Sequence, residues 1–582
     1  MFGFTAPAPL AGAFFCARQH VRGGIDPLSR YAAGIVGSSP NRGAFSQASN
    51  RGGMTSFDGV VIGAGHNGLT LAAYLARAGM KVAVLERNAI IGGGCSTDSD
   101  RLPGFRLNLH ANFYMGMSHC PLIEDLELYR YGFSYIEPPV QQAAVFRDGT
   151  GIVIHKDLDK SCASLARFSR QDAETFRALW HTYCIEMRPL LASLLYNAPL
   201  PREQLLDRLS GPQAKELLSH AQHDLFSVVR KHFVDERIRT LFTSYMHVIT
   251  TENVTGAGIV FPAIFANIAS FTLPVGGAVS LVNALARVVE AGGGQVVTGA
   301  DVREIKVESG RATGVTLADG RFIAGRKFVA SAIDFPATVQ MAGEELFPAP
   351  VREKAKAWHW GNHSLVTLHL ALRHAPAYRA AAFDPEIARA YNIFFGMDHI
   401  DEVASCFEDC AAKKFPKVLM GNGACNSHFD PTYAPPGQHA AFWWPFAPYS
   451  VDGGPQEWDR NRKNYTQRIL DYWRVYASNL EGDNLLGSTL FTPLDVERLN
   501  INMRQGAVRM GAYVPSQLGI NRPHPLLPGS RTPVEGLYLC GSSSGNGGGV
   551  NGAPGYIAAN AIADDLRLKR TWTPVPPPEW KH

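Results

Sequence analysis

The chain has 582 residues, of which 46% are hydrophobic and 18% are charged, and its formal net charge is +4. This length exceeds what one simple core supports, so we expect two or more domains. The composition is typical of a globular protein, and the small net charge without a block of Lys or Arg argues against a nucleic-acid partner.

The nine cysteines are scattered along the chain. They form neither a CxxC pair nor a zinc-ligand spacing, so we expect free thiols in a reducing compartment. Cys406 and Cys410 would share one face of a helix, but no further ligand accompanies them. The sequence therefore predicts no metal site.

Residues 1–56 differ in composition from the rest of the chain. They hold five arginines and six serines, but no lysine, no glutamate and a single aspartate. Such a composition is typical of an organelle-targeting presequence, which would place the protein in the mitochondrial matrix. The alternative is an unstructured leader, with Met54 as the working start of a cytoplasmic protein. In both cases we expect the fold to begin near residue 57.

Residues 57–86 carry the strongest local signal. An apolar strand leads into the turn GAGHNG, and a helix with apolar spacing, a second apolar strand and a terminal acid follow. This order predicts a dinucleotide-binding βαβ unit. Gly63 allows the tight turn, Gly65 lets the backbone approach a pyrophosphate, and Gly68 lets the helix pack on the strand. Glu86 is placed to bind ribose hydroxyls, and its charge would repel the 2′-phosphate of NADP.

The residues after Glu86 favour FAD over NAD. Arg87 follows the acid, and IIGGGCST at 90–97 adds three glycines that permit a second close approach of backbone to the cofactor. The other GxG lies in LMGNGACN at 419–426 and has no third glycine and no following helix. We expect a loop there and no second nucleotide domain.

Residues 146–270 and 336–505 lack nucleotide signals and are rich in helical patterns and aromatic side chains. They are expected to bind the substrate. The stretch 256–275 has twenty residues without a charge, but two prolines and an asparagine argue against a membrane span. We expect a buried helix that lines a cavity. Together with Trp443 and Trp444, it would be compatible with an apolar tunnel.

Three segments together resemble the phytoene desaturase-like flavoprotein family, which includes phytoene desaturases, carotenoid isomerases and retinol saturases. They are the N-terminal unit with its triple glycine, LPVGGAVSLVNALARVVEAGGGQVVTGADVREI at 273–305 and GLYLCGSSSGNGGGVNGAPG at 536–555. The likeness covers about residues 57–568 and is greatest to the pyridine nucleotide-disulfide oxidoreductase domain-containing protein 2 branch.

The resemblance implies an α/β fold with a Rossmann-type FAD-binding domain built from discontinuous segments and an interleaved α+β substrate domain. The FAD-binding segments would be 57–145, 271–335 and 506–568. The substrate domain would comprise 146–270 and 336–505, and residues 569–582 would form a tail.

The resemblance also implies which residues contact FAD. The turn at 63–68 would hold the pyrophosphate, and the C-terminal glycine run would lie along the ribityl chain and the flavin ring, where larger side chains would collide with it. The helix that starts near Gly555 would point its positive end at the flavin. The implied contacts are Gly63, Gly65, Gly68, Glu86, Arg87, Gly93, Gly94, Val302, Gly541, Ser542, Gly549 and Val550.

Catalytic side chains are harder to identify. His110 follows the triple glycine, where the family chain passes the flavin, and is the first candidate. His247, Glu252 and Arg509 are further candidates. The alternative for each is a structural side chain, and the chain has 19 histidines. No Ser/His/Asp arrangement or carboxylate pair competes with flavin chemistry.

The resemblance implies an FAD-dependent oxidoreductase that transfers a hydride to or from flavin N5. The substrate would be a lipophilic small molecule such as a polyene, which is desaturated, saturated or isomerised, and a peripheral contact with a membrane would fit such a substrate. Two alternatives remain open. One is an amine-oxidase-like flavoenzyme, and the other is a protein in which FAD is structural and the main role is interaction.

Overall fold

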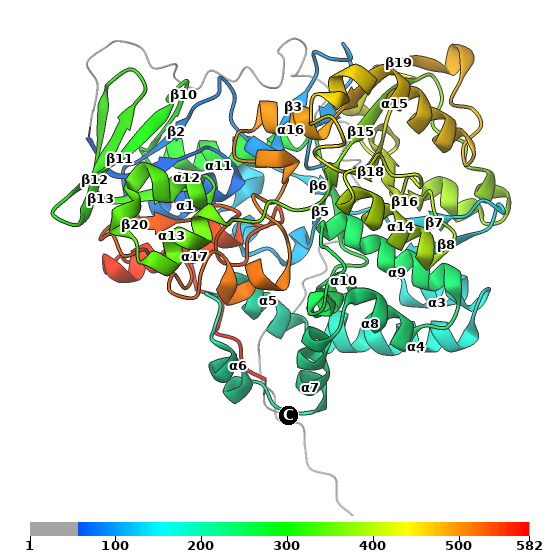
Figure 1. Ribbon diagram of the computed structural model, residues 1–582, viewed down its shortest axis with the longest axis horizontal. Coiled ribbons are helices and arrows are strands. Elements are labelled where there is room, and N and C mark those ends of the chain that lie inside the picture. Colours follow the sequence, from blue (N-terminus) through cyan, green and yellow to red (C-terminus); the bar gives the residue numbers. More distant parts are fainter. Residues whose placement is uncertain (1–55, 581–582) are drawn as a thin grey trace, which may run out of the picture. The chain divides into compact units, whose positions relative to one another are not determined.

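The computed structural model describes residues 56–580. The predicted presequence or leader at 1–56 lies outside the described residues, except for Ser56. Figure 1 shows two sheets, each with its own helices, and a helical region beside the second sheet. Strands that are far apart in the sequence are neighbours in both sheets.

The first sheet has seven strands and unites three distant parts of the chain. Five strands run parallel in the order β10-β2-β1-β13-β20, and β12 and β11 extend β13 as an antiparallel meander. The predicted Rossmann-type domain built from discontinuous segments, with an α+β domain interleaved in the chain, is therefore confirmed. The strands are β1 (Ser56–Ile62), β2 (Val82–Glu86), β10 (Gln295–Thr298), β11 (Val302–Glu308), β12 (Arg311–Leu317), β13 (Phe322–Ser331) and β20 (Leu537–Leu539).

Three helices pack together on one face of this sheet. Helix α1 (His66–Arg77) lies against both α11 (Val279–Ala291) and α17 (Ala553–Asp565). The buried faces of α1 and α17 are rich in alanine, which lets the helix axes approach closely. The approach is tightest at Gly555, where an added Cβ would lie 2.2 Å from the backbone oxygen of Asn67.

The second sheet has eight strands and contains no strand of the first sheet. Its order is β19-β15-β18-β17-β16-β7-β8, with β14 paired to β18. Helix α15 (Glu457–Arg474) covers one face through Trp458 and Trp473, which are fully buried. The strands are β7 (Val140–Val145), β8 (Gly151–His155), β14 (Ser364–Leu365), β15 (Thr367–Leu372), β16 (Asn392–Phe395), β17 (Gly421–Cys425), β18 (His439–Ala447) and β19 (Leu485–Phe491).

The expectation of a loop at 419–426 is wrong. Residues Gly421–Cys425 form β17, a central strand that pairs with β16 on one side and β18 on the other. An added Cβ at Gly421 would lie 2.4 Å from the backbone oxygen of Trp444. The glycines here thus permit close pairing of strands, which the sequence pattern alone does not distinguish from loop chemistry.

The expectation of one buried helix at 256–275 is also wrong in its length. The stretch folds as a short 3-10 turn (Ala257–Val260), the six-residue helix α10 (Phe261–Ala266) and the strand β9 (Phe271–Pro274). The helix ends where the Asn267 side chain donates to the backbone oxygen of Ala263, and β9 then pairs with β5 and β6. Among residues 56–580 no helix combines the length and the apolarity needed to cross a membrane.

The other elements surround these two sheets, and the exact domain boundaries stay predictions. The short strands are β3 (Thr97–Asp98), β4 (Leu107–Asn108), β5 (Tyr114–Met115) and β6 (Tyr135–Ile136). The remaining helices are α2 (Pro121–Asp125), α3 (Leu158–Ala166), α4 (Arg170–Trp180), α5 (Arg188–Tyr196), α6 (Arg202–Arg208), α7 (Pro212–Ser219), α8 (Leu225–His232), α9 (Glu236–Ile249), α12 (Phe335–Ala342), α13 (Ala349–Lys356), α14 (Ile400–Ala411) and α16 (Pro493–Leu499).

The contact between α1 and α17 can be tested by Gly555→Ala. The added methyl group would meet backbone at 2.2 Å, and such overpacking typically costs about 1–3 kcal/mol. We expect a lower midpoint in thermal or urea unfolding. An unchanged midpoint would show that the two helices are not tightly packed at this position.

Candidate cofactor and substrate site

One cavity of about 520 Å³ extends from the turn after β1 to the helices that flank the second sheet. Its volume is in the range of small-molecule and cofactor sites, about 300–1,000 Å³. Its lining includes residues of the GAGHNG turn, of the triple glycine, of the C-terminal glycine run and of helices α5, α9 and α10. A cofactor at the turn and a substrate against the helices would therefore share one space.

The GAGHNG turn offers an open cradle at this cavity. The backbone of Gly63 has a φ of 96°, which favours glycine. A Cβ at Gly68 would lie 2.3 Å from the oxygen of Gly63, so Gly68 serves the packing of α1. A Cβ at Gly65 would meet no atom within 4 Å, and Gly65 is the N-cap residue of α1. This free space at a helix N-terminus fits a pyrophosphate.

Glu86 ends β2 beside this cradle. Its two carboxylate oxygens accept the backbone N–H groups of Ala64 at 3.0 Å and Asn88 at 2.9 Å. Burial raises the pKa of the Glu86 carboxyl, and these two hydrogen bonds oppose that rise. Glu86 and Arg87 both line the cavity, where ribose hydroxyls of a bound nucleotide could use the free lone pairs of the carboxylate.

The C-terminal glycine run is tied to the GAGHNG turn by side chains of α1. Asn67 donates to Ser542 Oγ at 3.1 Å, and His66 Nε2–H donates to the oxygen of Gly549 at 3.2 Å. Burial lowers the pKa of His66 to about 4, so the ring is neutral at pH 7. Gly93, Gly94, Ser542, Gly549 and Val550 all line the cavity.

We expected the glycines of the C-terminal run because larger side chains would collide with the flavin ring, but this reason does not hold for all of them. An added Cβ would lie 2.6 Å from the oxygen of Ile333 at Gly541 and 2.4 Å from the oxygen of Ser542 at Gly547. These glycines are required because backbone meets backbone. Gly549 differs, since its nearest neighbour would be the Asn551 side chain at 3.1 Å and it lines the cavity.

Two predicted cofactor contacts lie outside the cavity lining. Gly541 is buried and precedes the lining residue Ser542. Val302 is the first residue of β11, and its side chain is buried in a hydrophobic cluster. Their contacts with FAD stay predictions. Asn546, by contrast, lines the cavity. Its amide donates to the carbonyl of Leu194 at 2.7 Å, which fastens the glycine run to α5.

The catalytic candidates divide into two groups. His110 and Arg509 line the cavity, whereas His247 and Glu252 do not. His247 is fully buried, with its ring 4.6 Å from that of Phe446, and does not line the cavity, so its catalytic role stays a prediction that this geometry does not support. Glu252 is instead held by His359 and Asn362 outside the cavity. Sequence position could not separate these cases because all four lie near apolar segments.

His110 presents a neutral imidazole to the cavity. Burial lowers its pKa to about 4, and the nearby positive charge of Arg101 acts in the same direction. Its ring packs edge-on against Phe491 at 5.3 Å. Its Nδ1 has no hydrogen-bond partner among the described residues. A buried nitrogen without a partner is uncommon in a folded protein.

Two buried guanidinium groups stand behind the glycine run without a counter-charge. Arg509 is 9% exposed and Arg522 is 1% exposed. Arg509 donates to the oxygens of Gly548 and Val248, and Arg522 donates to the oxygens of Ser542 at 2.8 Å and Arg509 at 2.6 Å. No carboxylate within residues 56–580 forms an ion pair with either. Burial lowers the pKa of Arg522 to about 10, which leaves it charged at pH 7.

An uncompensated buried charge is costly, and a bound anion would offset it. The open cradle at Gly65, the helix N-termini of α1 and α17 and the two arginines therefore fit FAD, which carries a pyrophosphate. Arg522 was not among the predicted site residues. In the sequence, Arg522 is marked only by its place in the run QLGINRP. In the structure, the hydrogen-bond partners of its guanidinium are all backbone oxygens.

The part of the cavity away from the GAGHNG turn, against helices α5, α9 and α10, is called the far part here, and it is apolar. The side chains that form it include Phe113, Leu191, Ile249, Ile259, Ile264 and Trp444. The basic side chains there are those of Arg188 and His119, the latter with a pKa lowered to about 4 by burial and by Arg188. Among all residues that line the cavity, Glu86 is the single carboxylate, and it belongs to the cradle end.

Comparison with known proteins agrees with this site. The model of the family "Flavin containing amine oxidoreductase" matches residues 68–563. A limonene dehydrogenase subunit of Castellaniella defragrans is 30% identical over 537 residues, covering 89% of this chain and 96% of that protein. Pyridine nucleotide-disulfide oxidoreductase domain-containing protein 2 of Mus musculus is 28% identical over 552 residues, covering 88% and 94%.

A phytoene desaturase (lycopene-forming) of Pseudescherichia vulneris is 25% identical over 521 residues, covering 88% of this chain and 99% of that protein. The crystal structure of an oxidoreductase from Methanosarcina mazei superposes with a TM-score of 0.57 and 18% identity, covering 87% and 99%. The resemblance seen in the sequence motifs is confirmed by these relatives.

The cradle can be tested by Gly65→Val. A branched side chain would extend into the free space at Gly65, where an added Cβ meets no atom within 4 Å, so we expect a folded protein that has lost its FAD. FAD released on denaturation is measured by absorbance, and folding by circular dichroism. Wild-type protein stripped of FAD is the matched control and should unfold at the same temperature. Full FAD content in Gly65→Val would contradict the placement of the pyrophosphate.

The role of the buried charge can be tested at Arg509. Arg509→Gln removes the charge, and Arg509→Lys keeps it. Because a nearby cation favours the electron-rich state of a bound flavin, we expect the midpoint potential of Arg509→Gln to fall by some tens of millivolts. Roughly 30 mV corresponds to about 1.4 kcal/mol for a two-electron couple. Spectroelectrochemistry that gave the same potential for Arg509→Gln and wild type, with FAD retained, would refute the assignment.

Proposed function

Because the chain belongs to the flavin containing amine oxidoreductase family, it is an FAD-dependent oxidoreductase, and we propose that its substrate is an uncharged, lipophilic molecule. The reaction would be a hydride transfer between a C–H bond of this molecule and bound FAD, in a desaturation, saturation or isomerisation. The observation that carries the proposal is the apolar far part of the cavity, which contains no carboxylate.

An amine substrate fits this lining less well. Most amines are cations at pH 7, and the strongest hydrogen bonds to such a cation come from carboxylates. The one lining carboxylate, Glu86, is held by the backbone at the cradle end. The far part instead presents Arg188, whose positive charge would repel a protonated amine. An apolar molecule would gain from burial against the leucine and isoleucine side chains.

Bound FAD supplies the acceptor or donor of two electrons. The chain would hold it at the Gly65 cradle and at Glu86, and Arg509 together with the N-terminus of α17 would balance its negative charge. The apolar wall orients the substrate and excludes water. His110 can hold or move a proton, because its neutral imidazole lines the cavity and its buried Nδ1 has no partner among the described residues.

Two of the relatives support a hydrocarbon-like substrate through their names. One is a limonene dehydrogenase subunit and another is a phytoene desaturase, and both limonene and phytoene are uncharged hydrocarbons. The two relatives differ greatly in substrate size, so the substrate of this chain is proposed only as a class. A mitochondrial location and a peripheral contact with a membrane stay predictions.

The substrate class can be tested by anaerobic titration of the FAD-loaded protein. We expect an isoprenoid hydrocarbon to bleach the flavin absorbance and putrescine or cyclohexylamine to leave it unchanged. In Leu191→Asn, a polar side chain of similar size replaces a cavity-lining leucine. Loss of about 1.5–3 kcal/mol of apolar burial should weaken hydrocarbon binding by about 10- to 100-fold.

Leu206→Asn is the matched control, because Leu206 lies on the next helix and is 40% exposed. It should bind the hydrocarbon as the wild type does. Bleaching by the amines but not by the hydrocarbon would favour the amine-oxidase alternative. A flavin that neither class reduces, in a protein to which neither class binds, would favour a structural role for FAD.

A further inference from the structure

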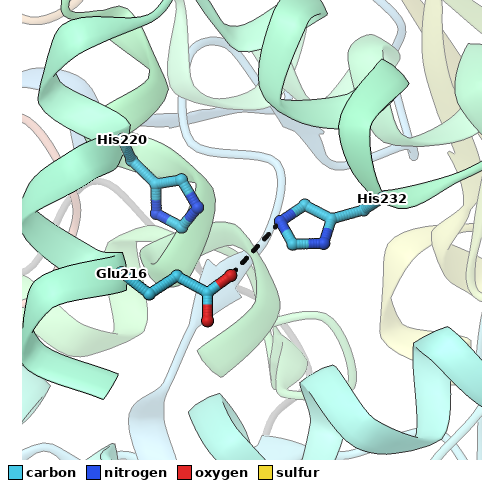
Figure 2. A group of neighbouring side chains, drawn as sticks. All are labelled: Glu216, His220 and His232. Atoms are coloured by element: carbon cyan, nitrogen blue, oxygen red, sulfur yellow. Dashed lines mark ion pairs between the residues drawn. The ribbon is translucent and has the colours of Figure 1, made fainter. Parts of the chain in front are cut away.

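Three side chains with metal-ligating atoms converge between α7 and the end of α8 (Figure 2). Glu216 belongs to α7, His220 follows directly after α7, and His232 is the last residue of α8. One ligand atom from each lies within 4.8 Å of the others. We propose that Glu216, His220 and His232 form a binding site for a divalent transition-metal ion, with Zn²⁺ the best match.

The hydrogen bonding of the two histidines leaves ring nitrogens free for a ligand. His220 is 1% exposed, and neither of its ring nitrogens has a hydrogen-bond partner within the described part of the chain. His232 Nε2 likewise has no hydrogen bond there and faces Glu216 Oε1 at 3.8 Å. Leaving a buried polar atom unpaired costs about 1–3 kcal/mol, and a metal ion would satisfy several such atoms at once.

Aromatic packing accounts for the burial of the two histidine rings but not for their unpaired nitrogens. The ring of His232 stacks on Phe261 at 5.1 Å, and the ring of His220 meets the same phenylalanine edge-on at 5.6 Å. Such contacts satisfy the faces and edges of the rings but not their nitrogen lone pairs. Burial lowers the pKa of His220 to about 4 and also lowers that of His232, so both imidazoles are neutral at pH 7 and keep a lone pair.

The ligand set determines which ion fits. Two imidazoles and one carboxylate are a zinc ligand set that leaves a fourth position for water. Mg²⁺ and Ca²⁺ prefer sites made entirely of oxygen atoms. Glu216 and His220 are four residues apart, which places them on the same side of a helical turn. Ligand bonds of about 2.0–2.2 Å require the three atoms to move closer, and the half-buried Glu216 side chain has room to do so.

One neighbouring charge acts against the site. Lys231 precedes His232 and lowers the pKa of both histidines by its positive charge. It is exposed, so solvent and salt screen it. Tyr183 lies on the other side, with its ring 6.5 Å from that of His220, and its pKa is raised by burial and by the charge of Glu216. Glu216 is thus the one carboxylate whose charge affects the pKa values of His232 and Tyr183.

The site would brace the cavity wall rather than take part in the chemistry. Phe261, on which both histidines pack, begins α10, and the turn before it carries Ile259. Ile259 and Ile264 of these elements line the cavity. A metal ion that joins α7 to α8 would therefore fix the layer directly behind the wall. The ligands act as structural groups, separate from the residues that would touch FAD or substrate.

The test uses the FAD-loaded full chain without an affinity tag. The protein is treated with a chelator, incubated with ZnCl₂, desalted and analysed for zinc by mass spectrometry, and binding is measured by calorimetry. The variants are Glu216→Gln, His220→Asn and His232→Asn. His223→Asn is the matched control, because His223 is an exposed histidine three residues from His220 and outside the cluster.

We expect one zinc per chain in wild type and His223→Asn, and no response to Mg²⁺. Each ligand variant should bind Zn²⁺ more weakly by at least the roughly 10- to 100-fold that loss of an outer-shell partner costs, with unchanged FAD content as the sign of a native fold. Equal zinc in all proteins, or none in wild type, would overturn the proposal.

A second measurement requires no variant. Hydrogen exchange of the wild-type protein with and without Zn²⁺ should show slower exchange within Pro212–Ser219 and Leu225–His232, since the ion would join these helices. Unchanged exchange in both helices at saturating Zn²⁺ would overturn the proposal even if zinc bound elsewhere on the chain.

Discussion

The packing of the last long helix on the first one is the constraint on which the rest of the site depends. Gly555 of α17 lies so close to the backbone of Asn67 in α1 that no side chain fits between them. This contact brings the N-termini of two helices to the same region. It also places the C-terminal glycine run over the GAGHNG turn, where Asn67 and His66 bind it. Segments nearly 500 residues apart thus form one surface of the cavity.

The second determinant is charge. The glycine run rests on Arg509 and Arg522, which are buried, donate mainly to backbone oxygens and have no carboxylate partner among the described residues. A protein that buries two cations in this way needs an anion nearby to offset their desolvation. Bound FAD would supply this anion, so binding of the cofactor and the stability of the loop are expected to be coupled. The single lining carboxylate, Glu86, lies at the cradle end, where backbone N–H groups hold it, and forms no ion pair with these arginines.

The cavity joins two different environments. Its cradle end offers backbone N–H groups, helix termini and one fixed carboxylate, whereas its far end offers leucine, isoleucine and aromatic side chains. The short helix α10 contributes to the far wall and packs, through Phe261, against His220 and His232 at the ends of α7 and α8. The proposed metal ligands lie in that outer layer and have no local motif. His232 is twelve positions from His220, and only the fold brings the two rings onto the same phenylalanine.

The sequence by itself determined the elements whose signals are local. The strand, turn, helix, strand and acid of 57–86 predicted the βαβ unit with its separate roles for Gly63, Gly65 and Gly68, because each role depends on residues within one short segment. Family motifs extended this to FAD and to the discontinuous Rossmann-type domain. Only the tertiary structure decided matters that depend on distant neighbours. It separated His110 from His247, since both lie in apolar segments but only one faces the cavity. It turned the expected loop at 419–426 into a central strand, because glycine permits close strand pairing as readily as a turn. It also revealed that Arg522 has no counter-charge among the described residues, since burial and ion pairing are properties of the folded chain and leave no mark on the sequence.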